Sequence, residues 1–384
     1  MSIKKQFIYQ RFGAYFASVC DGVENLLKQE LLDLGARKAQ TVYRGVNFDA
    51  DQDALYRINY MSGLATRIYA PLMQFACHST KYLHRTAVNI PWDDFLSLDK
   101  TFAISATVSH SAIKHSKYAA LCLKDAVADY FWEKYDKRPN VDTDNPDVWI
   151  NLHIQENKAH VSIDTSGGSL HRRGYRVMST EAPMQESVAA AIVRMSGWKG
   201  DRPLYDPMCG SGTLLAEAAL YYSKTPPAWQ RKAFGFIHLP DYKAGVWKNV
   251  KQQADKAVRD IPTGLIEGSD RDRNAVQAAL KNLEILPSGK RIFVSCTDFQ
   301  SLKPPKKSVI VCNPPYGIRM GNKDMVPALH QKLGEFLKKC KGSEAFVYFG
   351  NPEMIPALGL EPKWQKFLKN GGLKGKLVKY IIPD

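Results

Sequence analysis

The chain has 384 residues, of which 45% are apolar, and this length predicts two or three domains with proper hydrophobic cores. No apolar run approaches the ~18 residues of a membrane span, and the first residues lack the apolar stretch of a secretory signal, so we expect a cytoplasmic protein. The formal net charge of +15 predicts a polyanionic partner, most simply nucleic acid, with a merely soluble basic surface as the alternative and an anionic membrane less favoured.

The first half of the chain alternates strand-like and helix-like segments. A short apolar strand is expected at 14–19, and Asp21, with Glu24 three residues later, predicts the start of a helix. The following elements are expected as a strand at 42–48, a helix at 53–60 and a strand at 67–72. This β-α-β-α-β order with short connections is typical of a ferredoxin-like module.

A second group of elements comes next, and a change of composition separates it from the rest of the chain. Its elements are expected as a strand at 102–108, an amphipathic helix at 118–132 and a strand pair at 148–154 and 160–164. The segment that follows is rich in glycine and basic residues, including Arg172, Arg173 and Arg176. Such a segment is either a spacer or a strip that contacts phosphates, and the sequence leaves both readings open.

The second half is a run of strand-helix units, which indicates a parallel α/β sheet. Strands are expected at 203–205, 264–268, 291–294, 309–312, 345–349 and 376–382. Helices are expected at 184–195, 213–222, 248–259, 273–283 and 326–339. An irregular insertion rich in proline and tryptophan occupies 225–247.

The first chemical motif of this half is the segment from Asp206 to Thr213 at a predicted strand end. Its two glycines allow a ligand to approach the backbone at a helix N-terminus. A dinucleotide fingerprint needs a further glycine where Leu215 stands, and the Asp206 carboxylate would repel a pyrophosphate. It suits a ligand with ammonium and sulfonium groups, namely S-adenosylmethionine. The predicted cofactor-binding residues of this motif are Asp206, Pro207, Gly210, Ser211, Gly212 and Thr213.

Two more acidic residues end the next predicted strands. Asp270 is the candidate for the ribose hydroxyls of the cofactor, and Asp272, two residues later, is a candidate helix N-cap. Asp298 could accept a hydrogen bond from the adenine amino group, although a cap is the commoner role of such a residue. Ligands of open α/β sheets bind at the carboxyl ends of the strands, where these residues are expected to gather.

The fourth motif, Asn313-Pro314-Pro315-Tyr316, follows an apolar run that reads as a buried strand. Asn313 offers a carbonyl acceptor, and the proline after it restricts its backbone to extended geometry. Tyr316 offers a flat face on which a base could stack. Read alone, the motif could be only a strand terminator. Together with the other motifs it suits methyl transfer to an exocyclic amine, with Asn313, Pro314 and Tyr316 as the catalytic residues and Asn313 also beside the cofactor.

No metal site is expected. The histidines lack ligand spacing, and the seven cysteines are scattered without a Cys-x-x-Cys pair, which argues against zinc and disulfides. Cys209 and Cys312 flank the cofactor and substrate motifs, where covalent catalysis is conceivable. We expect small packing residues instead, because an exocyclic amine needs no covalent adduct.

These residues carry a resemblance to THUMP-domain, class I S-adenosylmethionine-dependent RNA methyltransferases, and more closely to the bacterial enzymes that modify guanine N2 in 23S ribosomal RNA. The segments that match most closely are 170–176, 182–183 with Glu186, 206–219, 268–272 with Asn282, and 313–317. The resemblance implies a seven-stranded Rossmann-like methyltransferase domain preceded by α+β ferredoxin-like and THUMP modules that bind structured RNA. The division it implies is a ferredoxin-like segment at 1–50, a THUMP domain at 51–165, a basic linker at 166–182 and the methyltransferase domain at 183–384.

The sequence also departs from the family at two positions. Gln185 stands where a lysine is usual, and Ile318 follows Gly317 where a glutamate is common. Transfer RNA guanine, adenine N6 and a glutamine amide are therefore alternative acceptors. A non-catalytic RNA-binding or ribosome-assembly protein is the rival from another class. The oligomeric state is not predicted.

Overall fold

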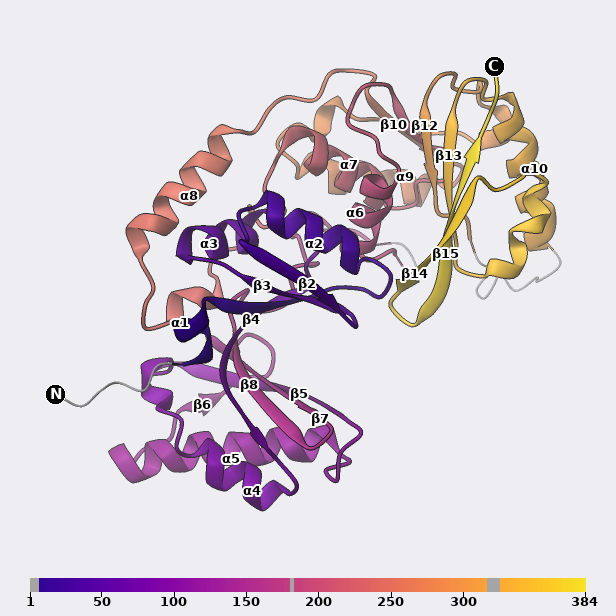
Figure 1. Ribbon diagram of the computed structural model, residues 1–384. Coiled ribbons are helices and arrows are strands. Elements are labelled where there is room, and N and C mark those ends of the chain that lie inside the picture. The colour runs from indigo at the N-terminus through magenta and orange to yellow at the C-terminus, as the bar shows by residue number, and fades with distance from the viewer. Residues whose placement is uncertain (1–6, 180–182, 316–324) are drawn as a thin grey trace.

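The computed structural model describes residues 7–179, 183–315 and 325–384, and these fold around two β-sheets (Figure 1). The eight-stranded sheet has the order β2-β3-β1-β4-β8-β7-β5-β6 and the seven-stranded sheet the order β11-β10-β9-β12-β13-β15-β14. In Figure 1 the first sheet runs from the centre to the lower end of the molecule, and the second lies at the upper right.

The N-terminal sheet joins both groups of elements that were expected in the first half. β4 is the strand they share, because it pairs with β1 on one side and with β8 on the other. The strands are β1 (Ala14–Ser18), β2 (Lys38–Val42), β3 (Gly45–Asp49), β4 (Arg67–Ala76), β5 (Thr101–Ser109), β6 (Asn140–Val141), β7 (Val148–Gln155) and β8 (Lys158–Asp164).

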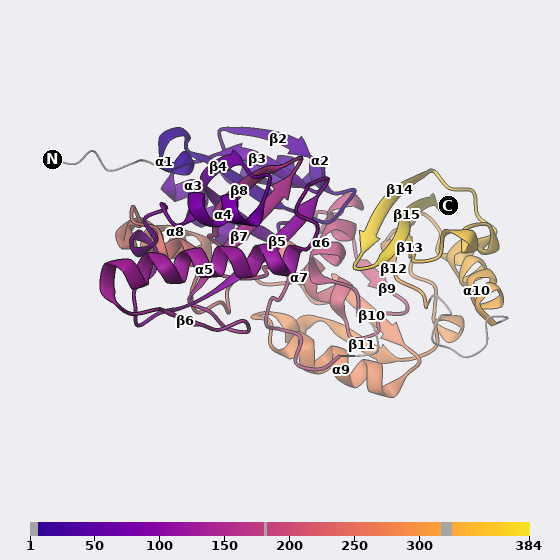
Figure 2. The same cartoon turned by 90° about the horizontal axis from the view of Figure 1, so that it is seen from below.

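Five helices accompany this sheet within the described residues. They are α1 (Ile8–Phe12), α2 (Glu24–Asp33), α3 (Gln52–Met61), α4 (Thr80–Ala87) and α5 (Ser116–Tyr135). Figure 2, seen from below, brings α5 to the front, so α4 and α5 cover the side of the sheet that faces away from α2 and α3. Buried residues of α5 such as Leu123 and Val127 close this part of the core.

One expectation for the first half is wrong, and another is right only in part. Val23, and not Asp21, stands at the N-cap of α2, and the Glu24 side chain accepts hydrogen bonds from the backbone N–H groups of Gly22 and Arg44. The strand expected at 42–48 coincides with β3 over residues 45–48, but Val42 ends β2, and residues 43 and 44 form the turn of the hairpin in which β2 and β3 pair antiparallel. Arg44 adopts a left-handed conformation with φ 55° in this turn, which the alternation of apolar residues does not reveal.

The C-terminal sheet is doubly wound, as expected. β9 (Leu204–Asp206), β10 (Ile266–Asp270), β11 (Phe293–Cys296), β12 (Val309–Cys312) and β13 (Glu344–Phe349) run parallel, while β15 (Leu373–Ile381) and β14 (Trp364–Asn370) form an antiparallel hairpin at one edge. All four residues of β12 are fully buried. Such a continuous apolar run is typical of a parallel strand that is covered on both faces.

Helices cover both faces of this sheet. α6 (Glu186–Met195), α7 (Thr213–Ser223) and α9 (Arg273–Glu284) belong to one core with Val309 and Val311, whereas α10 (Met325–Lys339) forms a second core with Ile310 and Cys312. The alternation along β12 therefore divides its side chains between the two layers.

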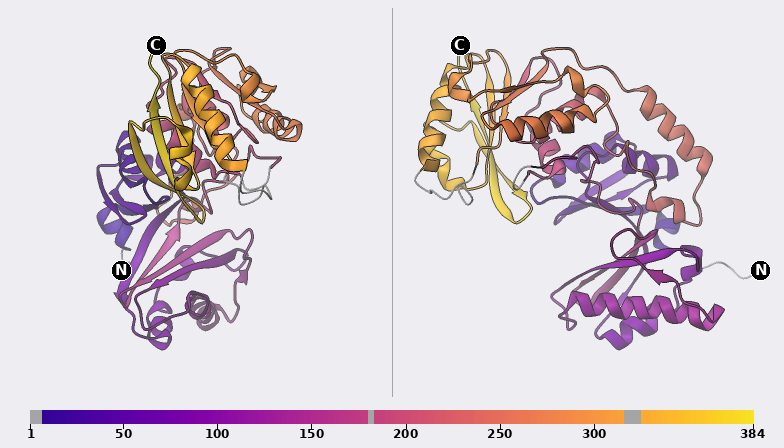
Figure 3. Two further views of the ribbon diagram at one scale, coloured as in Figure 1. Left: turned by 90° about the vertical axis from the view of Figure 1, so that its right-hand side faces the viewer. Right: turned by 180° about the vertical axis from the view of Figure 1, so that it is seen from behind.

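The insertion at 225–247 is irregular, as expected, apart from the 3-10 helix Gly235–His238 and the start of α8, and its aromatic side chains pack against α3. Phe234 and Phe236 stack at 5.0 Å, and Trp247 of α8 (Ala244–Lys256) packs edge-on against both. Tyr56 and Tyr60 of α3 complete this cluster, with ring centroids 4.5 to 6.5 Å from their neighbours. We call these five residues the aromatic clasp. Figure 3 shows α8 beside the N-terminal half, on the opposite side of the molecule from α10.

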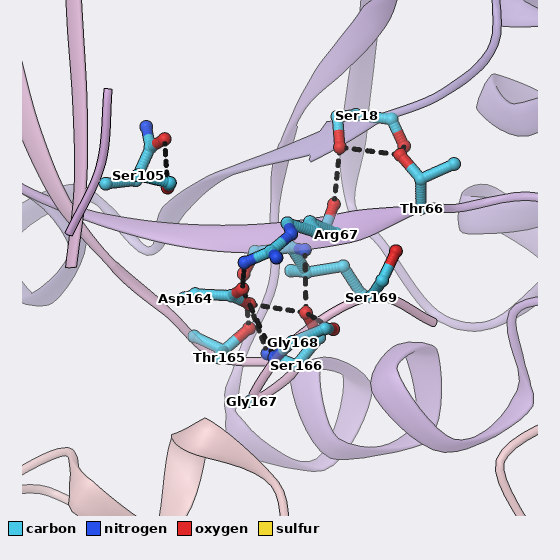
Figure 4. Close-up of polar contacts among 12 residues, drawn as sticks. Ser18, Thr66, Arg67, Ser105, Asp164, Thr165, Ser166, Gly167, Gly168 and Ser169 are labelled. Carbon is cyan, nitrogen blue, oxygen red and sulfur yellow. Dashed lines mark hydrogen bonds and ion pairs between the residues drawn. The ribbon is translucent and has the colours of Figure 1, made fainter. Parts of the chain in front are cut away.

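A polar junction lies beside the clasp, where β8 ends (Figure 4). Asp164 is fully buried, pairs with Arg67 at 2.6 Å and accepts from the backbone N–H groups of Ser166 and Gly168. A side chain in place of Gly235 would put its Cβ 1.9 Å from the Asp164 carbonyl oxygen. The close approach of the insertion to this turn therefore requires glycine.

Candidate active site

The motif residues that were expected to meet do meet at the carboxyl edge of the parallel strands. Asp206 ends β9, Asp270 ends β10, and Asn313 follows β12, which pairs with β9. Because parallel strands end at one edge of a sheet, these three side chains come from neighbouring strand ends. Tyr316 lies outside the described residues.

The loop after β9 is shaped by its glycines. Gly210 and Gly212 have φ of 54° and 78°, a region that L side chains rarely adopt. Gly212 caps α7 without any side-chain hydrogen bond, and a Cβ there would lie 3.1 Å from the Cβ of Ala279 on α9. The loop is thus drawn tightly over α9, and the first turn of α7 has backbone donors that no side-chain cap satisfies.

Asp206 is buried, with 1% of its surface exposed, and it makes one hydrogen bond to the backbone N–H of Met208 at 3.1 Å. Burial raises its pKa to about 8, the Met208 hydrogen bond offsets part of this, and the charge of Asp270 adds to it. Such a carboxylate gains most from a cation placed beside it, because the cation relieves the cost of burial.

Asp270 holds the glycine loop in place. Its Oδ2 accepts from the N–H of Gly210 at 2.9 Å, and its Oδ1 accepts from the N–H of Asp272 at 3.0 Å. Each carboxylate oxygen has a second lone pair that could accept from a ribose hydroxyl. Asp272 caps α9 through the N–H of Asn274, as expected for it.

Asp298 is half-buried and caps the short 3-10 helix Phe299–Ser301 through the N–H of Gln300 at 2.9 Å. The cap was one of the two readings of this residue. The bond uses one oxygen, and the role of Asp298 towards adenine stays a prediction.

Asn313 is half-buried and Pro314 is buried directly after β12. The strand that they follow, β12, lies between β9 and β13 in the middle of the sheet. Burial raises the pKa of the Cys209 and Cys312 thiols well above the usual range. Both cysteines are therefore protonated packing residues rather than nucleophiles.

Two further residues shape the site in ways that the sequence did not predict. Asn282 of α9 is buried, accepts from the N–H groups of Val177 and Met178, and donates to the Ser211 carbonyl. Arg176 donates to the Thr213 hydroxyl at 3.0 Å and pairs with Glu186 at 3.5 Å. The segment before α6 is thereby fastened onto the cofactor loop.

The arginines expected as a possible phosphate strip are mostly turned inward. Arg173 is 3% exposed, donates to the carbonyls of Gly63 and Leu170, and lies 3.5 Å from buried Glu217. Arg173 is buried, and Arg176 binds Thr213 and Glu186. The prediction that these arginines contact phosphates is therefore wrong for Arg173 and Arg176. Arg172 alone is exposed.

Across residues 7–179, 183–315 and 325–384, no cluster of three or more histidine, cysteine or acidic residues could hold a metal ion. No helix in that part of the chain is long and apolar enough to cross a bilayer.

Three family models match the chain in succession. They are described as an RlmL ferredoxin-like domain at residues 14–69, a THUMP domain at 77–164, and an RMKL-like methyltransferase domain at 173–379. The last covers more than half of the chain.

Two relatives are equally similar in sequence. The candidate RNA methyltransferase slr0064 of Synechocystis sp. is 37% identical over 370 residues, which are 96% of each chain. The ribosomal RNA large subunit methyltransferase K/L of Syntrophotalea carbinolica is 37% identical over 96% of this chain. The match covers 54% of that protein, so the present chain spans about half its length.

Solved structures agree with this fold over almost the whole chain. SMU.472, described as a candidate methyltransferase and solved with S-adenosylhomocysteine, superposes with a TM-score of 0.86 at 26% identity, over 97% of this chain and 98% of that one. A Listeria monocytogenes protein, described as a candidate N6-adenine-specific DNA methylase, gives a TM-score of 0.84 at 26% identity, over 97% and 96% of the two chains.

Proposed function

Since this chain belongs to the RMKL-like family of THUMP-domain, S-adenosylmethionine-dependent RNA methyltransferases, we propose that it methylates the exocyclic N2 of a guanine in 23S ribosomal RNA. The observation that carries the proposal is the pair of carbonyl acceptors, Asn313 and Pro314, held at the end of a central strand next to the strand of Asp206. The likeness to a K/L methyltransferase of the large ribosomal subunit supports ribosomal over transfer RNA.

The residues around the cofactor loop have a consistent set of roles. Asp206 would pair with the cationic methionine end, Asp270 would accept from the ribose hydroxyls, and Asp298 would accept from the adenine amino group. The loop residues Pro207, Gly210, Ser211, Gly212 and Thr213 would form the backbone cradle. The cofactor supplies an activated methyl group with a strong leaving group.

At the acceptor side, the chain must orient a poor nucleophile. The lone pair of the guanine N2 amine is delocalised into the ring. Asn313 Oδ1 and the Pro314 carbonyl would accept its two hydrogens and favour a pyramidal nitrogen with its lone pair directed at the methyl group. Tyr316 would stack on the base, which leaves its helix or lies in a loop. Catalysis then rests mainly on orientation and desolvation.

Mass spectrometry of nucleosides from ribosomal and transfer RNA, in cells with and without this protein, tests the proposal. We expect N2-methylguanosine to disappear from 23S RNA and to return when the protein is supplied again. Loss from transfer RNA would move the activity to the alternative substrate. Loss of N6-methyladenosine instead would overturn the guanine assignment.

A further inference from the structure

The positive charge of this protein is concentrated where the sequence pattern did not place an RNA-binding module. Residues 183–384 hold 31 Lys and Arg against 18 Asp and Glu, whereas residues 77–164 hold 10 against 12. Within the C-terminal part, residues 362–383 contain no acidic residue and six lysines. This stretch is the β14–β15 hairpin, at the edge of the seven-stranded sheet.

The strand register brings the outer half of this hairpin to the catalytic edge. Lys376 of β15 lies opposite Phe349, the last residue of β13. β13 runs parallel to β12, so its last residue marks the same edge as Asn313. Since neighbouring strands are ~4.8 Å apart, β15 lies roughly 10 Å from β12 in the sheet. The turn of the hairpin lies beyond Lys369 and Lys374, at the lower end of β14 and β15 in Figure 1.

Three lysines share one face of this outer half. Lys369 lies directly opposite Lys374, and Phe367 opposite Lys376. Opposed residues of an antiparallel pair point to the same face, and like charges in that position destabilise a hairpin. Among the described residues, no carboxylate lies within 4.0 Å of these lysines, whereas Lys379 at the other end of β15 pairs with Glu344 at 2.5 Å.

The outer half of the hairpin is also held firmly. The Asn370 side chain accepts from the backbone N–H of Gln185, directly before α6, at 3.1 Å. The N–H of Lys369 donates to the Asp21 carbonyl at 3.3 Å, and a Cβ at Gly22 would lie 2.5 Å from the Phe367 carbonyl oxygen. The backbone that carries these lysines is thus held by the N-terminal half and by the segment before α6.

We propose that Lys369, Lys374 and Lys376 form a docking surface for the RNA phosphates that flank the methylated nucleotide. The exposed ring of Phe367 lies on the same face and offers a neighbouring base a stacking surface. Bound phosphates remove the repulsion between the lysines, which makes a polyanion the occupant that fits. The inference rests on the proposed RNA substrate and does not depend on which base is methylated.

The test compares two triple variants of the full chain. Lys369→Gln/Lys374→Gln/Lys376→Gln removes the docking surface. Lys303→Gln/Lys306→Gln/Lys307→Gln removes the same charge from three exposed lysines before β12, at the opposite edge of the sheet. The probe is unmodified 23S RNA transcribed in vitro, and the dissociation constant is measured by filter binding from 50 to 200 mM salt.

We expect the hairpin variant to bind more weakly and its salt slope to fall by about 2, because each lost phosphate contact removes about 0.7 from the slope of a single strand. The control should keep its slope within about half a unit, and both variants should bind S-adenosylmethionine like the parent. Equal slopes for the two variants, or an unchanged slope for the hairpin variant, would show that the hairpin serves another partner, such as an acidic protein. Because binding is measured without turnover, a wrong assignment of the methylated base leaves this result unaffected.

Discussion

At the residue scale, Asp206 is a carboxylate that the fold buries with a single hydrogen-bond donor. With its pKa held at about 8 by burial, Asp206 is mostly protonated at pH 6 and must release that proton to pair with a cation. We expect the affinity for S-adenosylmethionine to rise by up to about tenfold between pH 6 and pH 7. Titration calorimetry in two buffers of different ionisation enthalpy will report the proton released.

The control for this prediction is Asp206→Asn, which has no proton to release. It should lose most of the cofactor affinity and all of the pH dependence. Because the folded protein keeps its Asp206 proton up to about pH 8 and the unfolded chain loses it near pH 4, the parent loses stability as the pH rises from 4 to 8. The Asp206→Asn variant should not lose stability over this pH range, because its side chain does not titrate. A pH-independent affinity of the parent protein would contradict the role of Asp206.

Asn313 is the residue on which the chemistry is predicted to depend. Asn313→Ala removes the acceptor for one amine hydrogen, and we expect the single-turnover rate to fall by at least about 100-fold. The dissociation constant of S-adenosylmethionine should change little. Asn351→Ala is the matched control, since Asn351 follows the neighbouring strand β13 and only caps a 3-10 helix. Wild-type turnover by the Asn313 variant would refute the mechanism.

At the scale of elements, the segment between β8 and α6 stabilises the fold through the buried contacts of Arg173. Arg173→Ala leaves Glu217 buried without its cation and two carbonyls without a donor, so we expect a loss of about 3–5 kcal/mol in the free energy of unfolding. Arg172→Ala, at the exposed neighbouring position, should change it by no more than about 0.5 kcal/mol. Urea denaturation of both variants measures the difference, and equal stabilities would restore the phosphate reading of this segment.

The C-terminal elements could be predicted where burial leaves a continuous apolar run. The strand expected at 309–312 has the same bounds as β12. The strand expected at 345–349 is one residue shorter than β13. β14 was missed because its lysines and aromatic residues do not alternate as a half-buried strand should. The strand expected at 291–294 is β11 two residues later, since a 3-10 turn at Gly289–Arg291 precedes it.

The candidate site likewise contains some residues whose roles could be predicted from the sequence and others whose roles could not. Asp206, Asp270 and Asn313 could be found because polar residues that directly follow apolar strands are visible in the sequence. The observed roles of Asn282 and Arg176 could not be predicted, because their partners are distant: Asn282 binds Ser211 across 71 positions, and Arg176 binds Thr213 across 37. The sequence also could not show that three lysines of the β14–β15 hairpin share one face, because this depends on how the two strands pair.

At the scale of the whole molecule, the aromatic clasp makes the two sheets depend on each other. Phe236→Ala opens a cavity in the clasp, and we expect a loss of about 3–5 kcal/mol in unfolding free energy. We expect one calorimetric transition for the parent protein and two separate transitions for this variant. Phe293→Ala removes a phenylalanine that is 61% exposed on β11 and should change stability by no more than about 0.5 kcal/mol. A single, equally stable transition in the Phe236 variant would mean that the halves are coupled elsewhere.

An ion pair and a hydrogen bond also join the two halves, in addition to the aromatic clasp. Glu30 of α2 pairs with Arg194 of α6 at 2.5 Å and accepts from the N–H of Gly63, while Tyr60 donates to Asp255 of α8 at 2.7 Å. Contacts from α2, α3 and the β14–β15 hairpin thus join the N-terminal half to the catalytic half at several places.

The clasp also limits how the chain can be dissected. Phe234, Phe236 and Trp247 belong to the C-terminal sequence, yet two of their ring partners are tyrosines of α3. Recombinant residues 183–384 alone would display these rings to water as a sticky patch, and such surfaces promote aggregation. A shortened enzyme intended for crystallisation or RNA labelling should keep α3, or carry polar replacements at these three positions.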